Sequence, residues 1–165
     1  MIIPFFLLFC MLAVLWFDVT RYMIPNWLCA ALLLLYPVAL YMSGMQADWQ
    51  GALIAFGITF AVGFVIFARK WMGGGDVKLI IACSLWVGLQ HLIEFVVLFA
   101  VIGGVLSIAL YALRKLLLRI KLAKQLPRLL RDGEPVPYGI AIASAFLIMM
   151  HTGKIPVMAS AGLGL

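Results

Sequence analysis

Six apolar stretches, separated by short polar connections, limit what this chain can fold into. They cover residues 2–17, 27–42, 50–68, 77–89, 92–113 and 138–150. Hydrophobic residues make up 67% of the chain and charged residues only 11%, whereas a soluble domain has about 45–50% apolar and about 25% charged residues. This small number of polar groups cannot cover a water-soluble globule. Lipid must therefore be the solvent for much of the chain. We therefore expect an all-α integral membrane protein with about six transmembrane helices, forming one domain over residues 1–165.

Positive charge alternates between the connections. Lys and Arg follow the first, third and fifth stretches, at Arg21, at 69–78 and at 114–131, whereas the connections after the second and fourth contain neither. Because Lys and Arg accumulate in cytoplasmic loops, we expect these three connections inside and both chain ends outside. No basic residue precedes Arg21, so the first stretch lacks the start of a signal peptide, and we expect it to be retained. Four tryptophans near the expected span ends are typical of interfacial anchors: Trp27, Trp49, Trp71 and Trp86.

The connection at 114–137 has leucines between its basic residues. This pattern is typical of a basic amphipathic helix lying on anionic membrane lipids, and a docking surface for a substrate or partner is the alternative. The net charge of +6 comes mostly from this connection, so nucleic acid is not needed as a partner. Cys10, Cys29 and Cys83 are widely spaced within apolar stretches, which favours small buried hydrophobes over a metal site or disulfide.

Two of the six acidic residues lie at the ends of apolar stretches. Asp18 ends the first stretch and Asp76 begins the fourth, so both lie beside basic connections. An acid at the bilayer centre costs at least about 2.5 kcal/mol, so acids near the membrane need a reason. Two carboxyls a few ångströms apart share one proton, so that one activates water and the other protonates a leaving group. This pair is the minimum for peptide hydrolysis without a metal or cofactor, and we expect neither.

Three glycines directly precede Asp76, at Gly73, Gly74 and Gly75. Glycine permits positive φ and lets a peptide backbone approach closely. The alternative is a flexible turn in which Asp76 caps the following helix. Asp18 also has a simpler interpretation, an ion pair with Arg21.

Together with their neighbours, the two aspartates resemble those of the type IV prepilin peptidases, a family of GxGD aspartyl proteases. Asp18 precedes the string Ile24-Pro25-Asn26, Asp76 lies in Gly73-Gly74-Gly75-Asp76 with Lys78 close behind, and Pro137-Tyr138-Gly139 opens the last stretch. The resemblance implies that Asp18 and Asp76 are catalytic. It also implies that the other residues of these strings support the site: Pro25, Asn26, Gly73, Gly74, Gly75, Lys78, Pro137, Tyr138 and Gly139.

The resemblance further implies a substrate and a location. The substrate would be a prepilin or pseudopilin, cut after its short basic leader at the cytoplasmic face of the bacterial inner membrane. The large members of the family carry a cytoplasmic cysteine-containing domain linked to methylation, for which this chain has no CxxC string. We therefore expect no separate methyltransferase domain and a likeness to the small stand-alone peptidases of tight-adherence (Flp) pilus systems.

Two other functions fit the same residues. Acids within membranes commonly serve as proton or cation sites, so a non-enzymatic transporter or channel subunit is one alternative. A related GxGD intramembrane protease with another substrate is the second. His91 and His151 fall on the expected outer side, away from the aspartates, where an interfacial histidine is the simpler interpretation.

Overall fold

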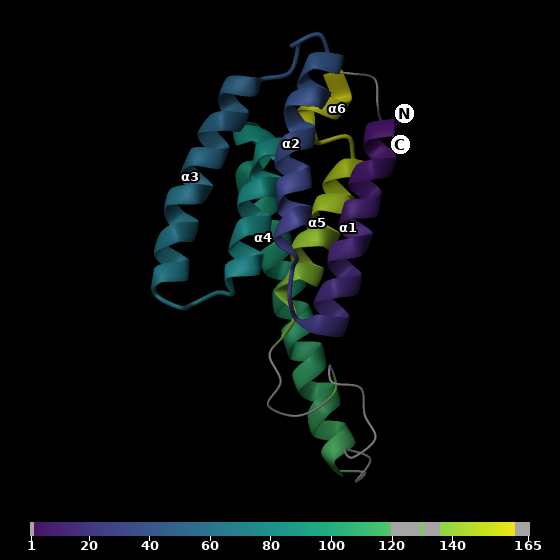
Figure 1. Cartoon of the computed structure of the whole chain (residues 1–165). Helices are drawn as coiled ribbons and strands as arrows, with labels where there is room; N and C mark the ends of the chain where they lie inside the picture. The colour runs from purple at the N-terminus through teal and green to yellow at the C-terminus, as the bar shows by residue number, and fades with distance from the viewer. Residues whose placement is uncertain (1, 120–129, 131–135, 161–165) are drawn as a thin grey trace.

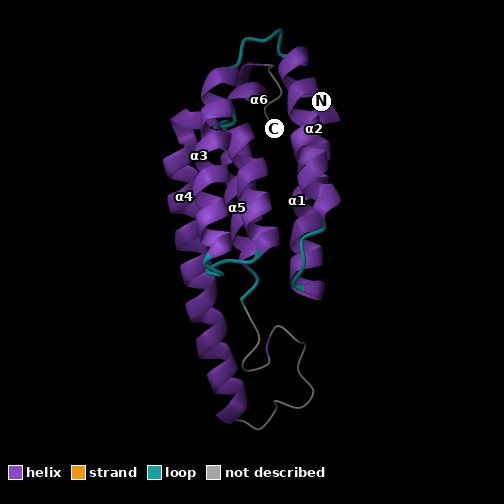
Figure 2. Cartoon of the chain, turned by 60° about the vertical axis from the view of Figure 1, so that its left-hand side comes forward, coloured by secondary structure: helices purple, strands orange, loops and turns teal. Residues whose placement is uncertain are grey.

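The computed structural model describes residues 2–119, 130 and 136–160, and they form an antiparallel helix bundle without strands (Figures 1 and 2). The helices are α1 (Ile2–Arg21), α2 (Asn26–Met42), α3 (Trp49–Ala68), α4 (Gly74–Arg119), α5 (Tyr138–His151) and α6 (Pro156–Ser160). α1 and α3 have 20 residues each, which gives about 30 Å of helix, the thickness of a hydrocarbon core. The expected all-α membrane fold is confirmed.

α4 consists of two arms that run in opposite directions. A straight helix of its 46 residues would be about 69 Å long, more than twice the thickness of the hydrocarbon core. Gly88 interrupts it with φ 70° and ψ 172°, a left-handed conformation that glycine adopts readily. The first arm rises from the turn after α3 to Gly88, beside Pro156, and the second returns past Gly103, which faces Tyr138 at the start of α5 (Figure 1). These arms correspond to the predicted stretches 77–89 and 92–113.

The expected count of six spans is not confirmed. Four described segments are long and apolar enough to cross a membrane: Ile2–Arg21, Trp49–Ala68, Gly74–Leu117 and Tyr138–Ser160. α2 is apolar but shorter, and the third of these segments contains both arms of α4. The short helix α6 was not expected from the sequence.

Buried polar groups join the helices to one another. Thr59 of α3 and Ser84 of α4 share a buried hydrogen bond of 2.7 Å between their hydroxyls, and the indole Nε1 of Trp86 donates to the Leu32 carbonyl of α2 at 3.0 Å. Such bonds matter in lipid because no water is present to satisfy a polar group. Trp86 is only 1% exposed, so its predicted role as an interfacial anchor is wrong, and its bond to α2 explains its position.

Basic residues mark one end of the bundle, where α1 and α3 finish and where α2, α4 and α5 begin. Arg21, Arg69 and Lys70 lie there, and we call it the basic end. The predicted amphipathic connection 114–137 falls mostly outside the described residues. Its first part, up to Arg119, continues the second arm of α4, which extends past the other helices at this end (Figure 2).

Candidate active site

A cleft of about 1050 Å³ lies at the basic end. The end of α1, the turn before α2, the turn before α4 and the start of α5 form its walls. Nearly all of the predicted site residues line it: Asp18, Pro25, Asn26, Gly73, Gly74, Gly75, Asp76, Lys78, Pro137 and Tyr138. The fold thus brings three strings that are far apart in the sequence to one place.

Asp18 lies in the last turn of α1 and is only 4% exposed. Its Oδ2 accepts a hydrogen bond of 3.0 Å from the backbone amide of Ile140, near the start of α5. The alternative ion pair does not form within the described part of the chain, because Arg21 lies over the ring of Phe17 instead, 5.3 Å from its centroid. The carboxyl is therefore held by another helix rather than by its neighbour in sequence.

Asp76 lies in the first turn of α4 and is partly buried. Like Asp18, it lines the cleft. A negative side chain is favourable at the N-terminus of a helix, so the predicted helix-end role of Asp76 and a role in the cleft are compatible.

The three glycines before Asp76 let neighbouring segments approach closely and do not adopt unusual backbone angles. None of them has a positive φ, which among the described glycines occurs only at Gly44, Gly88 and Gly153. A Cβ on Gly75 would lie 3.3 Å from Cβ and 3.5 Å from the backbone nitrogen of Ile24. The start of α4 therefore lies directly against the turn before α2, with little room for a side chain at Gly75.

Ile24 lies at the meeting point of the three strings. It is buried, and it faces Gly75 on one side and Gly139 on the other, where a Cβ would come within 3.0 Å of its Cδ1. Next to it, Pro25 precedes α2 in an extended conformation. Asn26 then accepts a hydrogen bond of 3.1 Å at its Oδ1 from Lys78 Nζ of α4.

Gly139 is the one predicted site residue that does not line the cleft. It lies behind Asp18: a Cβ on Gly139 would be only 2.6 Å from Oδ2 of that carboxyl. The Pro-Tyr-Gly string thus meets Asp18 at Gly139, which has no side chain.

Two contributors were not among the predicted site residues. Ile24 belongs to a string that the sequence singled out, but its apolar side chain gave no chemical signal. Ile140 contributes its backbone amide, which every residue but proline has, so residue type carried no information. Its position directly after Pro137-Tyr138-Gly139 was the only available signal.

The chemistry of the cleft is limited to a few groups. Its described lining contains two carboxyls, from Asp18 and Asp76, but neither histidine nor cysteine, serine nor threonine. Within 2–119, 130 and 136–160, no group of three or more His, Cys, Asp or Glu side chains comes together. The arrangement is suited to general acid–base chemistry by two carboxyls.

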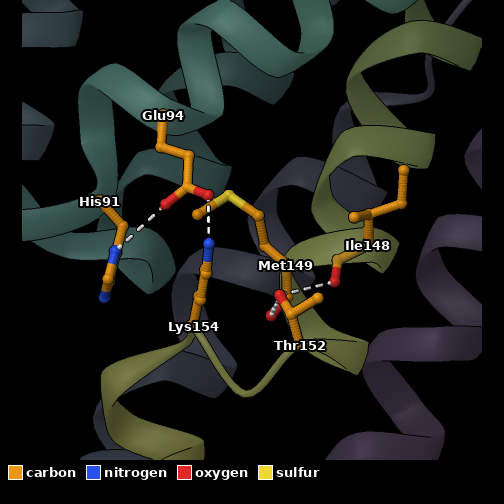
Figure 3. Close-up of polar contacts among 6 residues, drawn as sticks. All are labelled: His91, Glu94, Ile148, Met149, Thr152 and Lys154. Atoms are coloured by element: carbon orange, nitrogen blue, oxygen red, sulfur yellow. Dashed lines mark hydrogen bonds and ion pairs between the residues drawn. The ribbon is translucent and has the colours of Figure 1, made fainter.

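A second polar group lies at the opposite end of the bundle (Figure 3). Glu94 forms an ion pair with Lys154, and its other oxygen lies 3.5 Å from His91 Nδ1. Glu94 thus has two partners, His91 and Lys154, both at the end of the bundle away from the aspartates. The group joins the second arm of α4 to the loop between α5 and α6.

Comparison with known proteins gives a family. The sequence profile of the type IV leader peptidase family matches residues 5–108, a range that includes Asp18, Ile24-Pro25-Asn26 and the glycines with Asp76. No curated protein and no solved structure gives a match. Because the family profile covers more than half of the chain, the protein belongs to the type IV leader peptidase family.

Proposed function

We propose that this protein is a membrane aspartyl endopeptidase that removes the short basic leader from type IV prepilins or pseudopilins, with Asp18 and Asp76 as its catalytic pair. One observation carries the proposal: two acids from helices distant in sequence line the same cleft at the basic end. Family membership supports a leader peptidase in general and favours a peptidase over a transporter or channel subunit.

The proposed mechanism needs only the two carboxyls. One proton is shared by Asp18 and Asp76, so one carboxyl is ionised and the other protonated. The ionised carboxylate takes a proton from water as the water oxygen attacks the carbonyl carbon of the scissile peptide. The protonated carboxyl donates its proton to the carbonyl oxygen, and proton transfer to the amide nitrogen then releases the leader. Every proton is supplied by water or by the pair.

The position of the cleft fits a substrate that is itself embedded in the membrane. Cationic residues surround the basic end, and such ends face the cytoplasm. A prepilin keeps its basic leader on that side and its apolar segment in the bilayer. We therefore propose cleavage at the cytoplasmic face of the bacterial inner membrane, at the junction between the leader and the apolar segment.

Cysteine placement supports the narrower assignment to the small Flp-type peptidases. Cys10, Cys29 and Cys83 are all buried within helices, so none is available to the cysteine chemistry of the methylating members. We propose one transmembrane peptidase domain over residues 1–165, acting on an Flp-type prepilin without methylating it.

The test is cleavage of a synthetic prepilin by the purified protein in detergent, followed by mass spectrometry. Asp18→Asn and Asp76→Asn should each lower turnover at least about 100-fold, because an amide neither accepts nor donates the shared proton. The double variant should lose no more than either single variant, since the pair acts as a unit. Asp48→Asn is the matched control, because Asp48 caps α3 through Gly51, outside the cleft. Near-normal turnover by either cleft variant, at equal abundance in the membrane, would remove that residue from the mechanism.

A further inference from the structure

The start of α5 lacks a side-chain cap of its own. Pro137 precedes the helix with φ −73° and ψ 98°, and its side chain makes no capping hydrogen bond. The first amides of a helix have no partner within the helix and need an acceptor. Here Oδ2 of Asp18 accepts a hydrogen bond from the Ile140 amide at 3.0 Å. A cleft aspartate on α1 therefore supplies the cap of α5.

Gly139 is what permits this contact. A Cβ at this position would lie 2.6 Å from Oδ2 and 2.9 Å from Cγ of Asp18, closer than any real Cβ contact. Glycine inside a helix is less favourable than alanine, so its presence in the first turn of α5 has a cost that alanine would avoid. The approach of the Asp18 carboxyl gives a reason for it. By contrast, Gly57 and Gly104 face open space.

We propose that Gly139 and the Ile140 amide position Asp18: they hold its carboxyl, through Oδ2, in the place from which it acts together with Asp76. The inference rests on the proposed function, since it concerns how one member of the pair is oriented. A preorganised group loses much of its effect when it moves by an ångström. Gly139 itself does not line the cleft, so its effect passes through Asp18 rather than through contact with substrate.

The geometry predicts that a methyl group at residue 139 disturbs catalysis more than folding. The atoms that it would meet are the end of the Asp18 side chain and, at 3.0 Å, the terminal Cδ1 of Ile24. Both are side-chain ends that can rotate away, so the helix can still form. The Asp18 carboxyl, however, cannot remain on the Ile140 amide once it has rotated.

The first test is Gly139→Ala, assayed for kcat and KM with the same prepilin. We expect kcat to fall about 10- to 100-fold while KM changes little, at unchanged abundance in the membrane. Gly104→Ala, which meets open space, should stay within about 2-fold of the parent protein. Adding Ile24→Val removes the Cδ1 that the new methyl group meets. Recovery of kcat in Gly139→Ala/Ile24→Val would assign the effect to packing and overturn the proposal.

The second test removes the donor without adding a side chain next to Asp18. Ile140→Pro lacks the amide hydrogen, and proline is tolerated in the first turn of a helix. Ile140→Val keeps the amide and is its matched control. We expect kcat to fall about 10-fold further in Ile140→Pro than in Ile140→Val. Equal kcat in the two variants would overturn the proposal. So would loss of both Gly139→Ala and Ile140→Pro from the membrane, because the contact would then serve folding.

Asp18→Asn and Asp76→Asn belong in the same assay, because they distinguish failure of the proposed function from failure of the positioning role. If either cleaves normally, the proposed function fails together with the inference. If both are inactive while Gly139→Ala and Ile140→Pro keep the parent kcat, the proposed function stands and the positioning role is wrong.

Discussion

Lys78 donates a hydrogen bond from Nζ to Oδ1 of Asn26, at 3.1 Å. The bond joins the first arm of α4, two residues after Asp76, to the first residue of α2. The bond explains the presence of Asn26 after Ile24-Pro25 and of Lys78 after the glycines, since each side chain is the partner of the other. Both residues line the cleft, so the bond closes one wall of it.

A double-mutant cycle on this pair tests whether the bond supports activity. Asn26→Ala and Lys78→Ala should each lower kcat/KM roughly 3- to 10-fold, because a hydrogen bond to a charged group is worth about 1 kcal/mol or more. If the bond is the shared cause, the double variant should lose little more than the worse single variant. Losses that multiply in the double variant would show that the two side chains act independently.

Gly75→Val tests the close approach between the start of α4 and the turn before α2. Its new Cβ would meet the branched Cβ and the backbone of Ile24, neither of which can rotate away. We expect a loss of activity of about 10-fold or more, with a stability cost of about 1–3 kcal/mol from overpacking. Gly57→Val, a glycine-to-valine change into open space in α3, is the control. Normal cleavage by Gly75→Val would mean that the glycine run is only a flexible turn.

The helices were largely predictable from the sequence, and the turn inside α4 lies close to the expected break, but the residue that makes it was not identified. Apolar stretches predict helices well when a polar connection marks each end. Between the two arms the only polar residues are Gln90 and His91, and the predicted break fell there. The chain in fact reverses at Gly88, because glycine can take a positive φ at little cost and so needs no polar loop.

The candidate site was predictable as a set of residues but not as a set of contacts. Asp18 and Asp76 carry a signal in their residue type and position, since acids are costly near lipid. The contacts that join their strings depend instead on an absent side chain at Gly139, a backbone amide at Ile140 and an apolar side chain at Ile24. Such contacts follow from the packing of helices, which a single sequence does not specify.

Glu94→Gln separates a peptidase from a protein that moves protons across the membrane. Glu94 lies with His91 and Lys154 at the end of the bundle opposite the cleft (Figure 3). We expect the variant to keep its peptidase activity and to lose a little thermal stability, because a neutral amide pairs less well with Lys154 and His91 than a carboxylate. Lys154→Gln should do the same. Strong loss of cleavage in either variant would favour a functional route between the two ends.

The last prediction concerns the side of the membrane that the cleft faces, which joins topology to function. Labelling of single cysteines with a membrane-impermeant reagent measures it. Cys10, Cys29 and Cys83 are buried, so replacing them by alanine removes background at small structural cost. Exposed positions at the basic end are Thr20 and Arg69, and exposed positions at the opposite end are Gln46 and His151. Ser43, although it also lies at the opposite end, is only 5% exposed and would make a poor probe.

From outside the cell, cysteines at residues 46 and 151 should label, whereas those at residues 20 and 69 should label only after the membrane is made permeable. The reason is the concentration of Lys and Arg at the basic end, which translocates poorly. Labelling of residues 20 and 69 in intact cells would place the cleft on the outer face. A leader that stays in the cytoplasm could then not reach Asp18 and Asp76, and the proposed cleavage would fail even if both aspartates proved essential.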